Sequence, residues 1–339
     1  MAAENTVSFT VFRGSTSGNI VESTTTRELQ HNEIYIETTH SGLCGTDIHG
    51  LTAGFALGHE GIGFVRQIGP GVTSVTVGAR VGYGFYRKVC GHCDCCLTGW
   101  EQFCENRKQY TWHDHDIGTF GTGVVWDADA VFPIPDGLDS AEAAPLICAG
   151  GTIWTILTQY GIKGSDRVGI IGIGGLGHLA IKLAAAFGCH VVALSGDASK
   201  EAEALQYGAK EFHVYRTTDP KPDNFKALNH ILLCGSGNVD YLPLTELMAV
   251  HGTIYPITVT TDSVPIPLAP MLYKAIRIQT TFINSRHVMR SLLDFVVERN
   301  IKAEIQTFPM TAEGLEEAVK ILKEGKMRYR GVLVRDGIN

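Results

Sequence analysis

The sequence has no uninterrupted apolar run that approaches membrane-spanning length, and it has no excess of positive charge. Its 28 Lys and Arg residues face 35 Asp and Glu residues, so the net charge is −7. This balance offers no general attraction to nucleic acid or to an anionic membrane, and we expect neither as a partner. The first ten residues also lack a basic segment followed by an apolar stretch, so we expect no secretory signal and a cytoplasmic location.

The chain of 339 residues exceeds what one hydrophobic core usually supports, which predicts two domains. Its 44% hydrophobic and 19% charged residues are typical of a globular protein and argue against disorder. Nine cysteines form an odd set, and five of them lie between Cys90 and Cys104. In a cytosolic chain such clustering favours metal binding over disulfides.

The chain divides into an all-β part and a part in which strands and helices alternate. Before about residue 135, short β-branched or apolar segments are separated by turn residues, which predicts a barrel or sandwich with a loop at 86–118. After residue 140, the alternation predicts parallel βαβ units. We expect strands at 7–12, 33–39, 61–68, 79–83, 124–134, 167–173, 190–194, 211–215, 230–233, 253–259 and 331–334, and helices at 151–160, 176–187, 200–207, 288–299 and 312–323.

A glycine motif closes one predicted strand and opens the next predicted helix. It comprises Gly172, Gly174, Gly175 and Gly177, with Leu176 between the last two. Glycines here permit a tight turn and let the backbone approach a pyrophosphate at the helix N-terminus. The alternative is a turn that only packs the helix on the sheet, but the strand-to-helix context favours a dinucleotide site.

Four cysteines at short spacings predict a structural zinc site. Cys90, Cys93, Cys96 and Cys104 could supply four thiolates in tetrahedral geometry. The alternative is a set of unrelated thiols in a loop. Cys95 is surplus and could replace Cys96 as a ligand, although the even two-residue gaps favour Cys96. A site with no obvious open position is expected to be structural.

A second possible metal set is dispersed along the chain. Cys44, His59 and Cys148 are far apart, and each taken singly is more simply interpreted as a buried thiol or a satisfied histidine. Together they offer two sulfur ligands and one imidazole. With water in the fourth position, this is a catalytic zinc arrangement.

The motifs occur in an order that resembles a known family. The chain contains 42–49 (GLCGTDIH), 58–61 (GHEG), the four-Cys loop, 144–150 (APLICAG) and 172–177 (GIGGLG). This series resembles the zinc-dependent medium-chain alcohol dehydrogenases. The segments 176–180 (LGHLA) and 328–330 (RYR) resemble their cinnamyl-alcohol-dehydrogenase-like branch. The resemblance covers nearly the whole chain.

The resemblance implies a fold and a reaction. A GroES-like β-barrel catalytic domain would occupy residues 1–150, a Rossmann domain 151–285, and residues 286–339 would return to the catalytic domain. The substrate, a primary alcohol or aldehyde with aromatic ones among the candidates, would bind in the cleft between the domains. One catalytic and one structural Zn²⁺ are implied per chain, and hydride would pass between the substrate carbon and the nicotinamide.

The resemblance also implies roles near the catalytic zinc, whose ligands would be Cys44, His59 and Cys148. The hydroxyl of Thr46 would contact the alcohol oxygen, and His49 would be the base at the end of a proton relay through the cofactor ribose. Asp47 would orient His59, and Glu60 would lie beside the metal and transiently ligate it. For these two carboxylates the alternative is ordinary surface or turn polarity.

Cofactor choice is implied by the turn after the second strand of the Rossmann domain. Ser195 and Lys200 resemble the contacts of this branch to a 2′-phosphate, which favours NADP over NAD. Asp197 nearby, Gly196 in place of a second Ser, and the lack of an Arg in the turn oppose this interpretation.

Three departures from the family bear on the site and the assembly. Gly45 replaces a basic residue found near the pyrophosphate in some relatives, and Arg328 or Arg330 would compensate. The loop 50–57 is short and apolar, so family substrate preference should not be carried over. The β-branched segment 257–261 would pair with its twin in a homodimer, the alternative being an ordinary edge strand.

Two other functions compete with this interpretation. A zinc-free enone reductase on the same fold would be expected to lack the set of Cys44, His59 and Cys148. A zinc-ribbon protein that binds nucleic acid would need basic residues beside the four-Cys loop, and the net charge of −7 argues against it.

Overall fold

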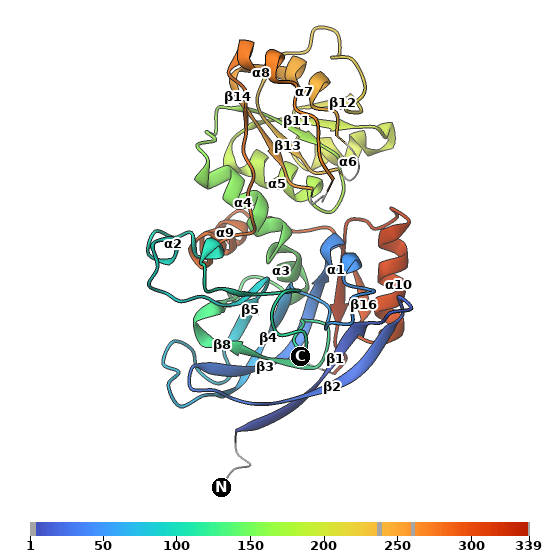
Figure 1. Ribbon diagram of the computed structural model, residues 1–339. Helices are drawn as coiled ribbons and strands as arrows, with labels where there is room; N and C mark the ends of the chain where they lie inside the picture. Colours follow the sequence, from blue (N-terminus) through green and yellow to red (C-terminus); the bar gives the residue numbers. More distant parts are fainter. Residues whose placement is uncertain (1–4, 236–238, 259–261, 338–339) are drawn as a thin grey trace. The chain divides into compact units, whose positions relative to one another are not determined.

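The protein is described by a computed structural model that covers residues 5–235, 239–258 and 262–337. It divides into two compact units; the colours of Figure 1 follow the sequence from the N-terminus in blue to the C-terminus in red. Unit 1 comprises Met1–Gly151 and Ile283–Asn339, and unit 2 comprises Thr152–Phe282. The two halves of unit 1 are therefore separated by the whole of unit 2 along the chain.

Unit 1 is built on a seven-stranded sheet in the order β16-β17-β3-β4-β5-β9, with β8 also paired to β3. Its strands are β3 (Glu33–Leu43), β4 (Gly61–Ile68), β5 (Arg80–Tyr83), β8 (Gly123–Asp127), β9 (Phe132–Pro133), β16 (Ile305–Pro309) and β17 (Arg330–Val334). β17 pairs antiparallel with β3, so that Val332 lies opposite Gly42. This pairing brings the end of the chain back to the first domain.

A two-stranded ribbon of β1 (Thr6–Gly14) and β2 (Ile20–Glu28) runs along the outside of unit 1, in blue in Figure 1. After the chain re-enters unit 1 at Ile283, it forms two helices, α9 (Arg286–Glu298) and α10 (Ala312–Lys323). The shorter elements are α1 (Gly45–His49), β6 (Tyr86–Lys88), α2 (Asp94–Leu97), η1 (Glu101–Phe103), β7 (Lys108–Gln109), η2 (Ala128–Ala130), α3 (Ser140–Ala143) and η3 (Ala144–Leu146).

Unit 2 contains a six-stranded parallel sheet in the order β12-β11-β10-β13-β14-β15. Its strands are β10 (Arg167–Ile171), β11 (His190–Ser195), β12 (Glu211–Val214), β13 (Leu228–Leu233), β14 (Met248–Pro256) and β15 (Arg277–Ile278). Its helices are α4 (Ala149–Gln159), which begins in unit 1, α5 (Gly177–Phe187), η4 (Ala198–Lys200), α6 (Glu201–Gln206), α7 (Tyr241–Leu247) and α8 (Leu268–Lys274). In Figure 1, α5 and α6 lie on one side of the sheet and α7 and α8 on the other.

The direction of chain progression in this sheet reverses at β10, which has β11 on one side and β13 on the other. Ligands of such doubly wound sheets bind at the carboxyl ends of the strands beside this reversal. The predicted fold class, an all-β catalytic domain with a Rossmann domain, is confirmed.

The predicted strand at 124–134 is wrong in one respect, because it is interrupted. β8 ends at Asp127, whose side chain accepts a hydrogen bond from the Asp129 backbone N–H and caps the short helix η2. Strand resumes only at β9. A side chain that captures a nearby N–H competes with ladder pairing, and a pattern of apolar residues does not reveal it.

Within the described residues no single helix is both long and apolar enough to cross a membrane. One pair of helices, Ser140–Leu146 and Ala149–Gln159, reaches that length and composition together, but it is bent by 56° at the break. The side chains of Ile153 and Ile156 in the second helix are completely buried.

Candidate active site

Four of the predicted site residues converge in unit 1. Cys44 lies between β3 and α1, His59 and Glu60 directly precede β4, and Cys148 lies between η3 and α4. One ligand atom from each of the four lies within 4.8 Å of the others. His59 and Glu60 are almost completely buried, with 1% and 0% of their surface exposed.

Asp47 on α1 holds this group together. Its Oδ1 accepts hydrogen bonds from His59 Nδ1 at 2.9 Å and from the Tyr110 hydroxyl at 3.0 Å. Its Oδ2 accepts from the Cys44 backbone N–H at 2.9 Å. The carboxylate therefore fixes the imidazole with Nδ1 protonated, which leaves Nε2 as the nitrogen that can give up its proton and bind a metal.

His59 Nε2 is the observation that tests whether a metal fits here. It is buried and has no hydrogen-bond partner among the described residues. Burying an imidazole nitrogen without a partner is costly. Two thiols and a carboxylate lie beside it, and this donor set is one that zinc prefers. The residues therefore fit a zinc ion.

The two thiols of the group shift each other's pKa in opposite directions. A hydrogen bond from Cys148 lowers the pKa of the Cys44 thiol well below its usual value, against the effect of burial. The same contact raises the pKa of Cys148. For His59, burial is the largest single effect and lowers the pKa, but the charge and hydrogen bond of Asp47 together with those of Cys44 outweigh it and raise the pKa well above 6.5. Metal binding at these groups would therefore release protons.

Glu60 is bound by a cation inside the same group. Arg330 Nη2 lies 2.5 and 2.6 Å from the two carboxylate oxygens, and both side chains are buried. Burial raises the pKa of Glu60 to about 7, although Arg330 opposes the rise. Arg330, predicted to contact the cofactor, thus has its charge matched by Glu60, and its contact with the cofactor stays a prediction.

Thr46 and His49, the other predicted catalytic residues, both lie on α1. Thr46 is partly buried, and its hydroxyl accepts a weak hydrogen bond from Cys44 Sγ at 3.7 Å. His49, the last residue of the helix, is exposed and is not part of the group of ligand atoms.

The four-Cys loop forms the second cluster. Cys90, Cys93, Cys96 and Cys104 bring their sulfur atoms within 4.8 Å of one another, and Cys95 is not among them. Backbone N–H groups point at the sulfurs, including Cys93 N–H to Cys90 Sγ at 3.4 Å. Hydrogen bonds from such groups, first that of His92, lower the pKa of Cys90 to about 6. Four sulfur atoms this close together fit a closed zinc site.

Sequence reasoning missed the residues that support these clusters. Glu101 in η1 accepts hydrogen bonds from the Arg286 backbone N–H at 2.7 Å, from Arg286 Nη2 at 2.7 Å and from the Tyr86 hydroxyl at 2.8 Å. This arrangement ties the four-Cys loop to the start of α9. Tyr110 supports His59 as well, because its ring packs 5.0 Å from the imidazole. No spacing signal links these residues, which are up to 185 positions apart.

The glycine motif in unit 2 leaves room for a ligand on one side only. A Cβ at Gly177 would lie 1.9 Å from the Gly172 carbonyl oxygen, and Gly172 itself has a φ of +91°. A Cβ at Gly174 would meet no atom within 4 Å among the described residues. Gly172 and Gly177 are therefore required by close packing, and Gly174 exposes the backbone before α5. Gly175 and Leu176 complete the turn into this helix.

The predicted cofactor residues after β11 occupy one turn. Ser195 is buried at the end of the strand, and its hydroxyl accepts from the Asp197 backbone N–H at 3.2 Å. The Asp197 carboxylate accepts from Ser199 N–H at 2.9 Å and so caps η4. Lys200 donates to the Ile173 carbonyl beside the glycine motif. Arg328, in unit 1, is exposed.

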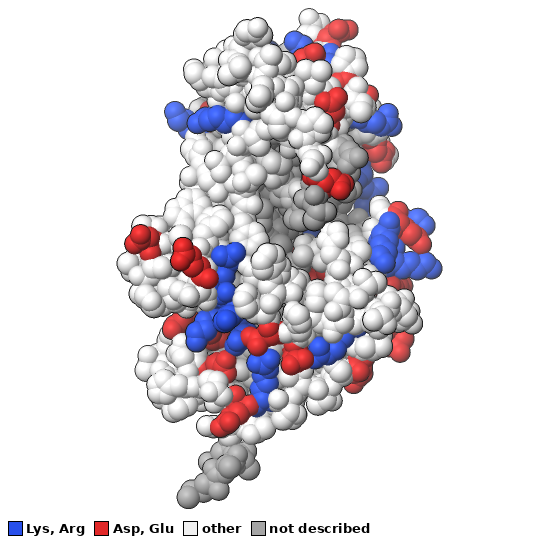
Figure 2. Space-filling view, viewed as in Figure 1, with Lys and Arg blue, Asp and Glu red and all other residues white. Residues whose placement is uncertain are grey.

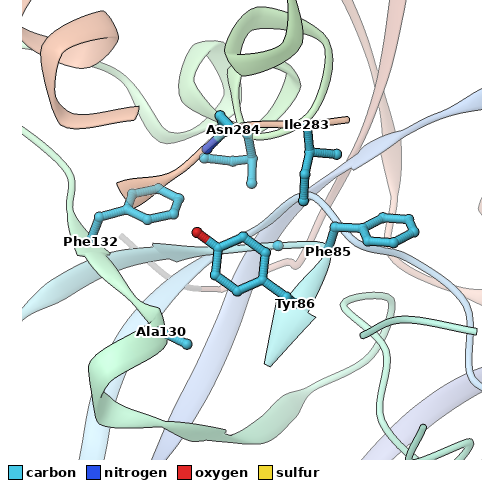
Figure 3. A pocket seen from close by; sticks show the side chains of 8 residues that line it. Phe85, Tyr86, Ala130, Phe132, Ile283 and Asn284 are labelled. Atoms are coloured by element: carbon cyan, nitrogen blue, oxygen red, sulfur yellow. The ribbon is translucent and has the colours of Figure 1, made fainter. Parts of the chain in front are cut away.

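A pocket in unit 1 is shown in Figure 3. Aromatic side chains supply much of its wall, and Phe85 also packs edge-on against His59 with ring centroids 5.5 Å apart. Figure 3 shows the Tyr86 and Phe132 rings side by side below Ile283 and Asn284. Its lining residues are Gly84, Phe85, Tyr86, Ala130, Phe132, Ile147, Ile283 and Asn284.

Comparison with known proteins agrees with this geometry. Residues 30–136 match the family described as Alcohol dehydrogenase GroES-like domain, and residues 175–298 match Zinc-binding dehydrogenase. The chain is 30% identical over 311 residues to Aldehyde reductase AdhA of a Synechocystis strain, covering 89% of this chain and 91% of that protein. It is 31% identical over 325 residues to NADP-dependent alcohol dehydrogenase C 1 of Mycolicibacterium smegmatis, covering 91% and 92%.

Among solved structures, cinnamyl alcohol dehydrogenase SbCAD4 of Sorghum bicolor superposes with a TM-score of 0.88 at 27% identity, covering 97% of this chain and 98% of that one. A Helicobacter pylori cinnamyl alcohol dehydrogenase complexed with NADP(H) also gives 0.88, at 23% identity, covering 97% and 98%. The chain belongs to the zinc-type medium-chain alcohol dehydrogenases, in their cinnamyl-alcohol-dehydrogenase-like branch, and is an alcohol dehydrogenase or aldehyde reductase.

Proposed function

We propose that this enzyme depends on zinc and transfers hydride between NADP(H) and a primary alcohol or aldehyde, with aromatic substrates among those it accepts. The observation that carries the proposal is the buried, unpartnered Nε2 of His59 beside Cys44 and Cys148 among the described residues. A zinc-free enone reductase would have no use for this costly arrangement.

Cys44, His59 and Cys148 would hold the catalytic zinc, with Glu60 beside it. When bound, the zinc supplies the Lewis acidity that lowers the pKa of a substrate hydroxyl. Asp47 keeps the proton of His59 on Nδ1. Glu60 stays against Arg330, which balances its negative charge next to the thiolates.

Two residues of α1 handle the substrate proton. The Thr46 hydroxyl, next to Cys44, would accept a hydrogen bond from the substrate alcohol and pass its own proton on as it receives the substrate proton. The exposed imidazole of His49, three residues further along α1, would be the base at the end of the proton relay and would release the proton to solvent. A neutral histidine suits this role because its ordinary pKa lies near working pH.

The cofactor would bind the glycine motif with its pyrophosphate and the turn after β11 with its adenosine ribose. Ser195 and Lys200 are in that turn, and capping of η4 occupies the Asp197 carboxylate. These features favour NADP over NAD, as does the NADP-dependent relative from Mycolicibacterium smegmatis.

The second cluster would hold a structural zinc through Cys90, Cys93, Cys96 and Cys104. All nine cysteines of the chain are free thiols, which supports a reducing, cytoplasmic location. On the face in Figure 2, Lys and Arg side chains are interspersed with Asp and Glu. A mixed surface of this kind favours a small-molecule substrate over nucleic acid.

We also propose a homodimer that forms through unit 2. Of the predicted contact segment 257–261, residues 259–261 lie outside the described residues. The neighbouring helix α8 supports the proposal because Leu268, Leu272 and Tyr273 are 67%, 77% and 88% exposed. Apolar side chains gathered on one helix are typical of a contact surface.

The catalytic assignment is tested with a pair of matched variants, Cys148→Ser and Cys93→Ser. The wild type is expected to contain two zinc ions per chain and to oxidise NADPH faster than NADH with aromatic aldehydes. Cys148→Ser should lose one zinc and all turnover while its thermal unfolding stays cooperative. Cys93→Ser should lose the other zinc and unfold at a lower temperature, because the metal stabilises a loop with little core of its own.

Zinc content is measured by mass spectrometry and turnover by NADPH absorbance. Full activity of Cys148→Ser, or wild-type activity that survives removal of all zinc, would rule out the zinc-dependent mechanism. Equal rates with NADH and NADPH would rule out the cofactor assignment alone.

A further inference from the structure

An arginine from another part of unit 2, Arg216, lies beside the turn that follows β11. β12 ends at Val214, and Tyr215 and Arg216 follow it. β12 pairs in parallel with β11, so that Val214 lies opposite Ser195. The Tyr215 backbone N–H donates to the Ser195 carbonyl at 2.8 Å and extends this pairing. Parallel pairing therefore places Arg216 at the carboxyl edge of the sheet, beside the turn.

Contacts of the Arg216 side chain confirm this placement. Its Nη2 donates to the Gly196 carbonyl at 3.4 Å, so the guanidinium lies against the turn. A Cβ at position 196 would lie 3.1 Å from both Cγ and Nε of Arg216. The glycine at this position therefore makes room for the arginine side chain.

The charge of Arg216 is not matched inside the described part of the chain. The guanidinium is exposed and forms no ion pair with a described carboxylate. Asp219 accepts a hydrogen bond from the backbone N–H of Arg216 at 2.7 Å, not from its side chain. The carboxylate of Asp197, the acidic residue of the turn itself, accepts hydrogen bonds from the Ser199 backbone N–H at 2.9 Å and from the Ser199 hydroxyl at 2.7 Å.

We propose that Arg216 binds the 2′-phosphate of NADP(H), taking the place of a basic residue within the turn. The proposal rests on the NADP dependence proposed above and adds a specificity-determining residue to Ser195 and Lys200. A guanidinium can contact a phosphate with two parallel N–H groups, which a neutral ribose hydroxyl cannot match. Gly196 and Arg216 then act as a pair, because the small residue admits the large one.

The experiment compares full-length, zinc-loaded wild type with Arg216→Ala, Arg216→Lys and a matched control, Lys210→Ala. Lys210 is exposed and lies at the opposite, amino end of β12, so it tests the loss of one positive charge from the same strand. Binding of adenosine 2′,5′-bisphosphate and of adenosine 5′-monophosphate is measured by calorimetry, because neither ligand depends on the reaction.

Arg216→Ala is expected to weaken binding of the bisphosphate about tenfold or more, the loss typical of one hydrogen bond to a charged group. Binding of the monophosphate should not change, and Arg216→Lys should restore part of the loss. Lys210→Ala should bind both ligands like wild type. In steady state, Arg216→Ala should raise KM for NADPH and leave kcat unchanged.

Two outcomes separate the two proposals. If wild type binds the bisphosphate more tightly but Arg216→Ala binds it equally well, the role of Arg216 is refuted and NADP dependence stands. If wild type does not distinguish the two ligands, both the NADP assignment and the role of Arg216 fall.

Discussion

At the residue scale, the site depends on charges that are buried in pairs. Glu60 and Arg330 are nearly inaccessible to water, and each compensates the other next to the predicted zinc ligands. Breaking one partner of a buried pair leaves an uncompensated charge, which costs far more than the intact pair contributes. The position that makes this pair possible is Gly42, on the neighbouring strand β3.

Replacing Gly42 by alanine is expected to break the pair. The new Cβ would lie 2.0 Å from Glu60 Oε2, and the buried carboxylate can move away only by leaving Arg330. We expect Gly42→Ala to lose about 3 kcal/mol of unfolding free energy, the scale for a broken buried pair. Urea unfolding measures this loss, and zinc content should fall with it.

Gly45→Ala is the control for this substitution, because a Cβ at Gly45 meets no described atom within 4 Å. It lies in α1, where alanine is a better helix former than glycine. Its stability should therefore equal or slightly exceed that of wild type. Equal stability of both variants would show that Glu60 is not confined as described.

At the scale of elements, one carboxylate ties the beginnings of three parallel strands. Glu211 on β12 accepts from Arg167 on β10 at 2.6 Å through each of two nitrogens, and from His190 on β11 at 2.8 Å. Hydrogen bonds from Arg167 are the main cause that lowers the pKa of Glu211 from 4.5 to about 2. The carboxylate is thus favoured in the folded state.

A carboxylate with a depressed pKa stabilises the fold above its unfolded pKa and loses this effect as pH falls through the folded pKa. Glu211→Gln should therefore be less stable than wild type at pH 7, and the gap should close between pH 4.5 and about 2. We expect a gap of about 0.5–1 kcal/mol, since the side chain is 34% exposed and solvent screens the pair.

Urea unfolding at several pH values checks this, with Asp223→Asn as the control because Asp223 is exposed. The control should follow wild type at every pH. A gap for Glu211→Gln that stays constant down to pH 2.5 would contradict the ion-pair explanation.

The elements that could be predicted from sequence are those with a strong local pattern. β4 and α10 have the predicted bounds, because their apolar residues repeat at strand and helix spacing. β2 was not predicted, because its sequence IVESTTTRE is mostly polar and exposed along one side of a two-stranded ribbon. Pairing with β1 stabilises this strand, and the sequence pattern within the segment does not predict that pairing.

At the scale of the whole molecule, the open question is what covers the apolar side of α8. Leu272→Asp would place a charge on the proposed contact surface without touching the core, since Leu272 is 77% exposed. A charge buried without a partner disfavours association. We expect wild type to sediment at about twice the chain mass of 36.7 kDa and Leu272→Asp at the single mass.

Analytical ultracentrifugation measures both masses. Leu205→Asp on α6, where the leucine is 44% exposed, is the control and should remain dimeric. A monomeric wild type, or a Leu272→Asp variant that is still dimeric, would refute the proposed interface.

Ligand types and their spacing predicted the four-Cys cluster and the turn that could bind a dinucleotide, whereas Cys44, His59 and Cys148 were predicted as ligands from the resemblance of the motif series to a family. Cys44, His59 and Cys148 stand in recognisable short motifs, and the glycines of 172–177 stand between a strand and a helix. These are local properties, since each motif must supply its own chemistry and backbone shape.

The partners of these groups were decided only when distant segments met in the fold. Glu60 meets Arg330 across 270 positions, Asp47 meets Tyr110 across 63, and the β11 turn meets Arg216 across 20. Sheet pairing makes the first and the third of these contacts, because β17 pairs with β3 and β12 with β11, whereas a side-chain hydrogen bond joins Asp47 to Tyr110. Burial and hydrogen bonding depend on which groups are close in space, and the separation of two residues along the chain does not predict whether their charges will be buried together.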